Sequence, residues 1–101
     1  MTGAAALTDD SPLPWPSPSA IFKALSEGGV LLSTPDEVYF GVNPVGAKIW
    51  SLLPPTSRTF GGLCTELERS YPDVDPIRLR AEAWQFIESL VASGLAVARA
   101  A

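Results

Sequence analysis

The sequence contains no histidine and a single cysteine, Cys64, among its 101 residues. One cysteine cannot form an intrachain disulfide, and without histidine it cannot contribute to a Cys/His zinc cluster. The same absences remove most of the side chains that serve as nucleophile or general base, and leave scattered serines and carboxylates. Cys64 itself lies at an apolar helical position, where it is expected to be a core residue. We therefore expect no metal, no cofactor and no catalytic activity.

Cationic residues and long apolar runs are also scarce. The chain carries 7 Lys and Arg against 11 Asp and Glu, a formal net charge of −4, whereas non-specific nucleic-acid affinity requires an excess of cations. No apolar run approaches the ~20 residues of a membrane span. No basic region leads into an apolar stretch near the N-terminus, as it does in a secretory signal. The sequence thus predicts a cytoplasmic protein that binds neither nucleic acid nor membrane.

Proline is abundant but unevenly placed. Four of the ten prolines occupy alternate positions between residues 12 and 18. Proline lacks an N–H group and disrupts helices, so this run is a poor candidate for either regular structure. We predict that residues 1–18 form a disordered, proline-rich tail and that the folded domain spans residues 19–99.

Three short apolar runs rich in branched residues follow, at residues 19–25, 29–34 and 37–42, with turn-forming residues between them. In the third run, Val38, Phe40 and Val42 lie on one face of an extended chain and Tyr39 and Gly41 on the other. Runs of this length and composition predict a three-stranded antiparallel meander.

Beyond residue 42 the apolar period changes from two to 3.6. Asn43-Pro44 and Asp75-Pro76 each combine an N-cap residue with proline at the first helical position, and Thr59 is a third N-cap. Gly94 ends the last helix. The sequence therefore predicts an α+β fold, similar to a winged helix-turn-helix, in which the three-stranded meander is followed by three helices.

The third predicted helix is apolar over more of its circumference than one core requires. Packing between the sheet and the other helices can account for the whole surface. Alternatively, the helix and the third strand leave an apolar trough beside an open strand edge, where an extended peptide can bind by strand addition. A second copy of the chain can pair with the same edge, so a homodimer is also possible. Arg80 lies within the apolar surface and should reach solvent or a carboxylate.

Residues 37–53, EVYFGVNPVGAKIWSLL, resemble the PqqD-like family of precursor-recognition proteins. The residues that carry the resemblance are Tyr39, Val42-Asn43, Gly46-Ala47, Ile49-Trp50 and Leu52-Leu53. Thr59, Leu63, Leu67, Tyr71, Val74 and Gly94-Leu95 extend it over residues 20–97. Gly46 is expected to permit close packing of the first helix on the sheet, and Trp50 is expected in the core.

The resemblance implies a protein that binds the leader peptide of a ribosomally synthesised precursor between the third strand and the third helix. The leader-binding residues that it implies are Val38, Tyr39, Phe40, Gly41, Val42, Ile77, Arg80, Ala81 and Trp84. The segment NPVGAKIW is most similar to stand-alone members of lasso-peptide pathways, which implies a leader peptidase and a macrolactam synthetase as partners. Val42, Val45 and Pro54-Pro55 depart from the commonest family pattern.

The main alternative is a winged-helix DNA-binding regulator, because that architecture is shared. Its recognition helix would present Arg78, Arg80 and Gln85, against Glu82 and Glu88, on an acidic domain. A carrier protein of similar size would need an attachment serine at a helix start, and Ser51 is expected in mid-helix.

Overall fold

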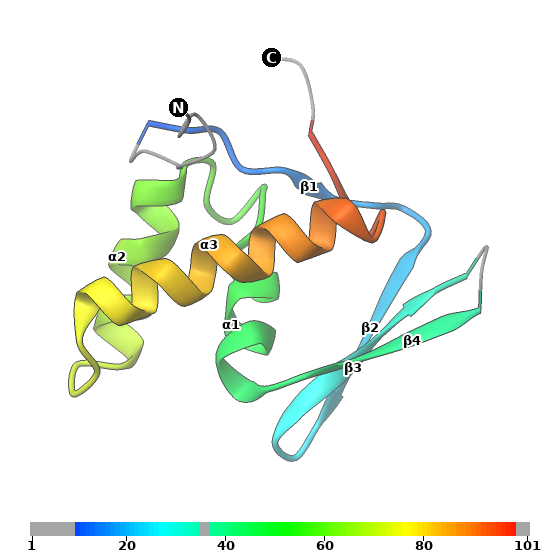
Figure 1. Cartoon of the computed structure of the whole chain (residues 1–101), viewed down its shortest axis with the longest axis horizontal. Coiled ribbons are helices and arrows are strands. Elements are labelled where there is room, and N and C mark those ends of the chain that lie inside the picture. Colours follow the sequence, from blue (N-terminus) through cyan, green and yellow to red (C-terminus); the bar gives the residue numbers. More distant parts are fainter. Residues whose placement is uncertain (1–9, 35–36, 99–101) are drawn as a thin grey trace.

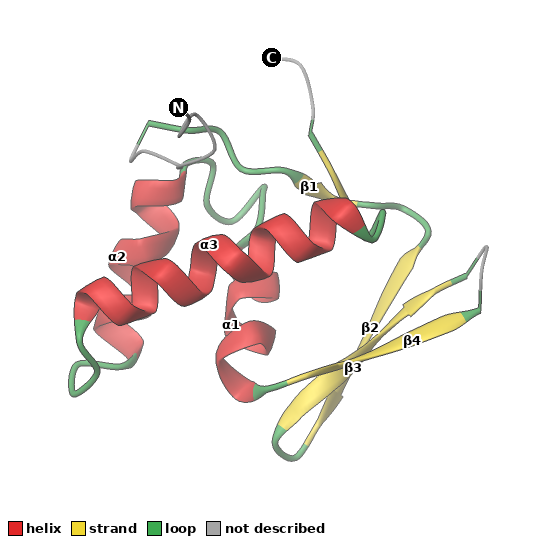
Figure 2. Ribbon diagram, viewed as in Figure 1, coloured by secondary structure: helices red, strands yellow, loops and turns green. Residues whose placement is uncertain are grey.

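The computed structural model describes residues 10–34 and 37–98. Three strands precede three helices, as predicted, and a two-residue strand lies at each end of the described chain (Figures 1 and 2). The elements are β1 (Trp15–Pro16), β2 (Ala20–Leu25), β3 (Gly28–Ser33), β4 (Val38–Val42), α1 (Pro44–Leu52), α2 (Phe60–Ser70), α3 (Pro76–Ala92) and β5 (Ala96–Val97). The predicted α+β fold with an antiparallel meander is confirmed.

The three-stranded sheet has the order β2-β3-β4, with every pair antiparallel and no break in register. Along β3, buried and half-buried residues alternate. Gly29, Leu31 and Ser33 face the helices, whereas Gly28, Val30 and Leu32 face away from them. The sheet therefore has one face packed on the core and one outer face that no helix covers among the described residues (Figure 1).

Each helix begins at the N-cap expected from the sequence. The Asn43 side chain accepts a hydrogen bond of 2.7 Å from the Gly46 N–H, and Thr59 accepts one of 3.2 Å from Gly62. Asp75 accepts a bond of 3.0 Å from the Ile77 N–H. These side chains satisfy backbone donors that the first helical turn leaves unpaired. The boundaries predicted from caps and prolines are therefore close to the observed ones.

The core lies where α3 crosses α1 and α2 beside the inner face of the sheet (Figure 2). Leu79, Ala83, Ile87 and Leu90 of α3 are each at most 3% exposed and form its inward face. Trp50, expected in the core, is half-buried and stacks on Phe22 with 6.4 Å between ring centroids. Among the described helices, none combines the length and apolar character needed to cross a membrane.

The predicted disordered tail is wrong for residues 10–18. β1 pairs with β5 in antiparallel register, and Leu13 is only 4% exposed. Leu13 N–H donates to the Arg58 carbonyl at 3.0 Å, and Ser17 N–H donates to the Leu95 carbonyl at 2.9 Å. In an extended chain, the main-chain groups of successive residues point to opposite edges. Leu13 and Ser17 direct their N–H groups to the paired edge, and the prolines lie at the alternate positions, where no N–H donor is needed. The domain therefore begins well before the expected boundary at Ser19, and residues 1–9 and 99–101 lie outside the described residues.

Replacing Leu13 by alanine tests this correction. Leu13→Ala should lower the free energy of unfolding by about 2–5 kcal/mol, because truncating a buried leucine loses transfer energy and leaves a cavity. Leu25, which is 53% exposed, provides the matched control, and Leu25→Ala should change the free energy by less than about 0.5 kcal/mol. Urea unfolding measures both, and equally small effects would contradict the burial of the N-terminal segment.

Candidate functional site

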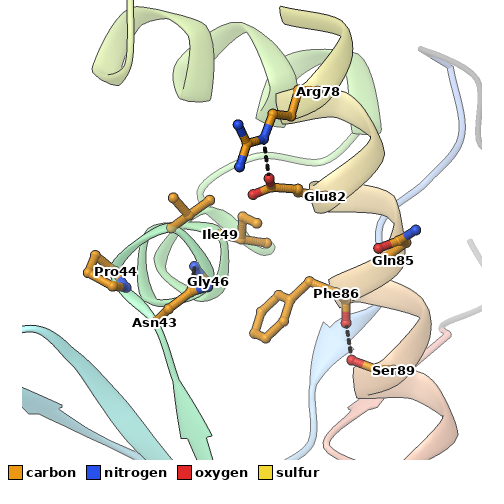
Figure 3. A pocket seen from close by; sticks show the side chains of 10 residues that line it. Asn43, Pro44, Gly46, Ile49, Arg78, Glu82, Gln85, Phe86 and Ser89 are labelled. Carbon is orange, nitrogen blue, oxygen red and sulfur yellow. Dashed lines mark hydrogen bonds and ion pairs between the residues drawn. The ribbon is translucent and has the colours of Figure 1, made fainter. Parts of the chain in front are cut away.

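A groove runs along one side of α3, where this helix faces β4 and the start of α1. It consists of two cavities that share Phe86 and Ser89. The smaller cavity has a volume of about 210 Å³ and is lined by Leu31, Phe40, Gly41, Val42, Phe86, Ser89, Leu90, Ser93 and Leu95. The larger, of about 630 Å³, is lined by Asn43, Pro44, Val45, Gly46, Ile49, Arg78, Glu82, Gln85, Phe86 and Ser89 (Figure 3).

The smaller cavity is apolar because it borders the inward faces of the sheet and of α3. Leu31, Leu90 and Leu95 are at most 2% exposed, and no charged side chain lines this cavity. Phe40 is half-buried and directs its side chain to the same face of the sheet as Val42. A space of this size and lining favours one apolar side chain of a ligand.

The larger cavity is more polar. Arg78 Nε lies 2.9 Å from Glu82 Oε2, and Ser89 Oγ donates to the Phe86 carbonyl at 2.8 Å (Figure 3). The Arg78 and Glu82 side chains are 73% and 39% exposed, so this ion pair adds only about 0–1 kcal/mol to stability. The groove thus changes from apolar to polar toward the N-terminus of α3.

Gly46 determines how closely α1 approaches the other elements. A Cβ atom at this position would lie 2.8 Å from Val42 Cγ1 and 3.2 Å from Phe86 Cε1. Contacts this short are closer than van der Waals packing allows. The missing side chain therefore lets α1 pack against both β4 and α3, which agrees with the role expected from the sequence. Figure 3 shows the Phe86 ring directed toward Gly46.

β4 is an edge strand, because in the described sheet it pairs only with β3. Its main-chain directions follow from the register. Thr34 N–H donates to the Ser19 carbonyl. The even-numbered residues of β3 therefore form their main-chain hydrogen bonds with β2, and the odd-numbered residues form theirs with β4. Val38, Phe40 and Val42 consequently direct their N–H and C=O groups toward β3. Tyr39 and Gly41 direct theirs to the open edge, beside the groove.

The structure brings together the predicted site residues of β4. Phe40, Gly41 and Val42 line the smaller cavity, while Val38 and Tyr39 are 42% and 69% exposed. The predicted residues of α3 line neither cavity. Ile77 is 77% exposed, Ala81 is exposed and Trp84 is half-buried. The Arg80 guanidinium lies 5.3 Å from the Phe60 ring centroid, in cation–π contact with α2.

Sequence reasoning missed the α3 residues that face β4, chiefly Phe86 and Ser89. Gln85, Ser89 and Ser93 form a polar strip along the helix, which by itself suggests a solvent-facing surface. The available signal was Phe86, an aromatic residue about one helical turn from Ser89 and about two turns from Ser93. Periodicity identifies residues that share a face, but it does not identify the element that each face meets.

Cys64 has none of the features of a reactive thiol. It is 2% exposed, and burial together with the nearby Glu68 carboxylate raises the pKa of its thiol from 9.0 to about 11. The thiol therefore stays protonated at neutral pH, whereas the thiolate is the nucleophilic form. The described residues contain no group of three or more Cys, Asp or Glu side chains placed to hold a metal ion.

The reactivity of Cys64 can be measured directly. At pH 8, iodoacetamide should alkylate the folded protein at least roughly a hundredfold more slowly than the protein in 6 M guanidinium, because two pKa units lower the thiolate fraction by that factor. Since the fold favours the protonated thiol, this group should also destabilise the protein as pH rises from 9.0 toward about 11. Intact-mass spectrometry follows the reaction, and equal rates in both states would contradict the burial.

Comparison with known proteins adds two findings. The sequence model of the family described as Coenzyme PQQ synthesis protein D (PqqD) matches residues 28–96. Among solved structures, one described as TbiB1 in complex with the TbiA(beta) leader peptide is similar, with a TM-score of 0.73 and 25% sequence identity. The similarity covers 86% of this chain and 99% of that chain. None of the curated proteins matches the sequence.

Proposed function

This chain belongs to the PqqD family, and we propose that it binds the leader segment of a ribosomally synthesised precursor peptide as an added strand on β4. The observation that carries this proposal is the open edge of β4 beside an apolar groove. An extended peptide needs both features, because main-chain hydrogen bonds hold the strand and pockets select its alternate side chains.

The two features have different roles in binding. Tyr39 and Gly41 offer their N–H and C=O groups to the added strand, and each such hydrogen bond contributes about 0.5–1.5 kcal/mol net. A guest residue opposite Phe40 would direct its side chain to the inner face, toward Phe86 and Leu90. Burial of a large apolar side chain there contributes about 1.5–3 kcal/mol. The hydrogen bonds therefore hold the strand on β4, and the groove sets its register by selecting the side chain that enters.

The similarity to TbiB1 supports the choice of ligand, because that protein was solved with a leader peptide. The segment NPVGAKIW supports a lasso-peptide pathway for this chain. We propose that the protein, in the cytoplasm, presents the bound precursor to a leader peptidase and a macrolactam synthetase. The chemical steps then belong to these enzymes, in keeping with the protonated, buried thiol of Cys64.

The DNA-binding alternative receives little support from the charges on α3. Arg78 is paired with Glu82, and Arg80 lies against Phe60. Recognition of a major groove requires such side chains to project freely from an electropositive surface, whereas the chain has a net charge of −4.

Proline at Gly41 tests strand addition. Gly41→Pro removes an N–H group that points to the open edge and leaves the β3–β4 pairing intact, because proline is tolerated on edge strands where the N–H faces solvent. The dissociation constant for a leader peptide should rise at least about tenfold, from the lost hydrogen bond and the bulk of the ring. Fluorescence anisotropy with labelled leader peptides, starting with TbiA(beta), gives the affinities.

Ala24→Pro is the matched control. Ala24 lies on β2, the opposite edge strand, and its N–H also points away from β3 by the same register. This variant should keep the affinity of the unmodified protein, and circular dichroism checks that both variants fold. Equal loss in both, or no loss in Gly41→Pro, would contradict strand addition at β4.

A second prediction separates the two sides of α3. Ser89→Trp should fill the groove and raise the dissociation constant at least about tenfold, since it blocks the apolar contacts of the guest strand. Ala81→Trp, at an exposed position outside both cavities, should leave the affinity unchanged. The same anisotropy assay applies. If Ala81→Trp weakens binding and Ser89→Trp does not, the leader contacts the other side of α3, at Ile77, Arg80, Ala81 and Trp84.

A further inference from the structure

Gly41 lies in the interior of an edge strand, where the fold itself gives no reason for a glycine. Three other glycines have such a reason, because an added Cβ would come within 3.0 Å of a neighbouring atom. These are Gly28, Gly29 and Gly46, which approach Val42, Phe22 and Val42 respectively. A Cβ at Gly41 would have no atom within 4 Å, and Gly41 is not among the described glycines with positive φ.

A glycine of this kind is costly. Glycine in the middle of a strand destabilises a protein by roughly 0.5–1 kcal/mol relative to alanine. In strands, a glycine without an internal cause often marks a place where a ligand or another backbone approaches closely. Gly41 also offers its N–H and C=O to the open edge and lines the smaller cavity. Gly41 therefore lies directly beside the path of the proposed guest strand.

The free space at Gly41 opens on the outer face of the sheet, away from the groove. Gly41 pairs with Val30, and the next residue on the same face of β4 is Tyr39. We name the gap above Gly41, between Val30 and Tyr39, the outer notch. A row of apolar side chains continues from Tyr39 through its partner Leu32 to Ile21, which is 52% exposed. The surroundings of the outer notch are therefore apolar and aromatic.

We propose that the outer notch receives a large apolar or aromatic side chain of the leader strand, an inference that rests on the function proposed above. The guest residue that faces Gly41 directs its side chain to the outer face, because residues opposite one another share a face of the sheet. An aromatic side chain opposite a glycine on a neighbouring strand covers the bare backbone and stabilises the pair.

The chemistry around the outer notch selects against a charged guest. Val30 is half-buried beneath it, Tyr39 borders it, and the nearest cation on this face, Lys23, lies beyond Val30 on β2. A carboxylate would lose hydration there without gaining a partner. The leader is therefore recognised on both faces of the sheet. Sensitive positions in the leader should be consecutive, one residue facing the groove and its neighbour facing the outer notch.

Filling the outer notch tests the proposal. Gly41→Val should raise the dissociation constant of an unmodified leader peptide at least about fivefold, because valine occupies the volume of the guest side chain. An alanine scan of the leader then supplies the second half of a double-mutant cycle. One large-to-alanine peptide should bind Gly41→Val as tightly as it binds the unmodified protein, and the other scanned peptides should keep the fivefold loss.

Ala24→Val, at an exposed position of the opposite edge strand, is the matched control and should bind every peptide normally. If Gly41→Pro weakens binding but Gly41→Val weakens no peptide, or weakens all of them equally, the outer-notch proposal is wrong while strand addition stands. If no leader peptide binds the unmodified protein, the proposed function itself is wrong.

Sedimentation of the protein without leader peptide provides a last check. In the contrary outcome, the protein without leader forms a dimer that Gly41→Val dissociates, while the variant keeps its affinity for the leader. That result would contradict the proposal and would assign the outer notch to Tyr39 of a second copy.

Discussion

The close approach of α1 to β4 and α3 is the constraint on which the rest of the site depends. One residue, Asn43, separates β4 from α1, and its side chain caps the helix through the Gly46 N–H. Gly46 then brings the helix within contact distance of Val42 and Phe86. The Phe86 ring, toward which α1 is thereby brought, borders both cavities. A turn, a cap and a missing side chain therefore position the groove beside the open edge.

Much of this arrangement could be predicted from the sequence, because it is encoded locally. Asn43-Pro44 and Asp75-Pro76 specify helix starts through capping and a fixed φ angle, and the alternation in Val38, Phe40 and Val42 specifies which face of β4 is buried. The pairing of β1 with β5 joins residues about eighty positions apart, so no local pattern encodes it. The alternating prolines indicated disorder, although their spacing suits a chain paired along one edge only.

The residues predicted on α3 do not line the groove, for a related reason. Periodicity places Arg80, Ala81 and Trp84 on one side of the helix and Phe86 and Ser89 on the other. It does not reveal that Arg80 meets Phe60 of α2, or that Phe86 meets Gly46 of α1. Such pairings depend on how the helices cross, which follows from the packing of the whole core. Sequence alone therefore indicated the edge strand of the proposed site, but not which side of α3 faces that strand.

The length of β4 limits what strand addition can contribute. Its five residues lie between Glu37, which has a φ of 53°, and the N-cap Asn43, so only Tyr39 and Gly41 present main-chain groups to a partner. Four hydrogen bonds together contribute about 2–6 kcal/mol net, which is below most of the range of about 4–15 kcal/mol for the cost of association. A polar strand without suitable side chains would consequently bind weakly. A peptide that also fills the groove and the outer notch gains apolar burial on both faces, and this burial gives a short edge selectivity for one class of partner.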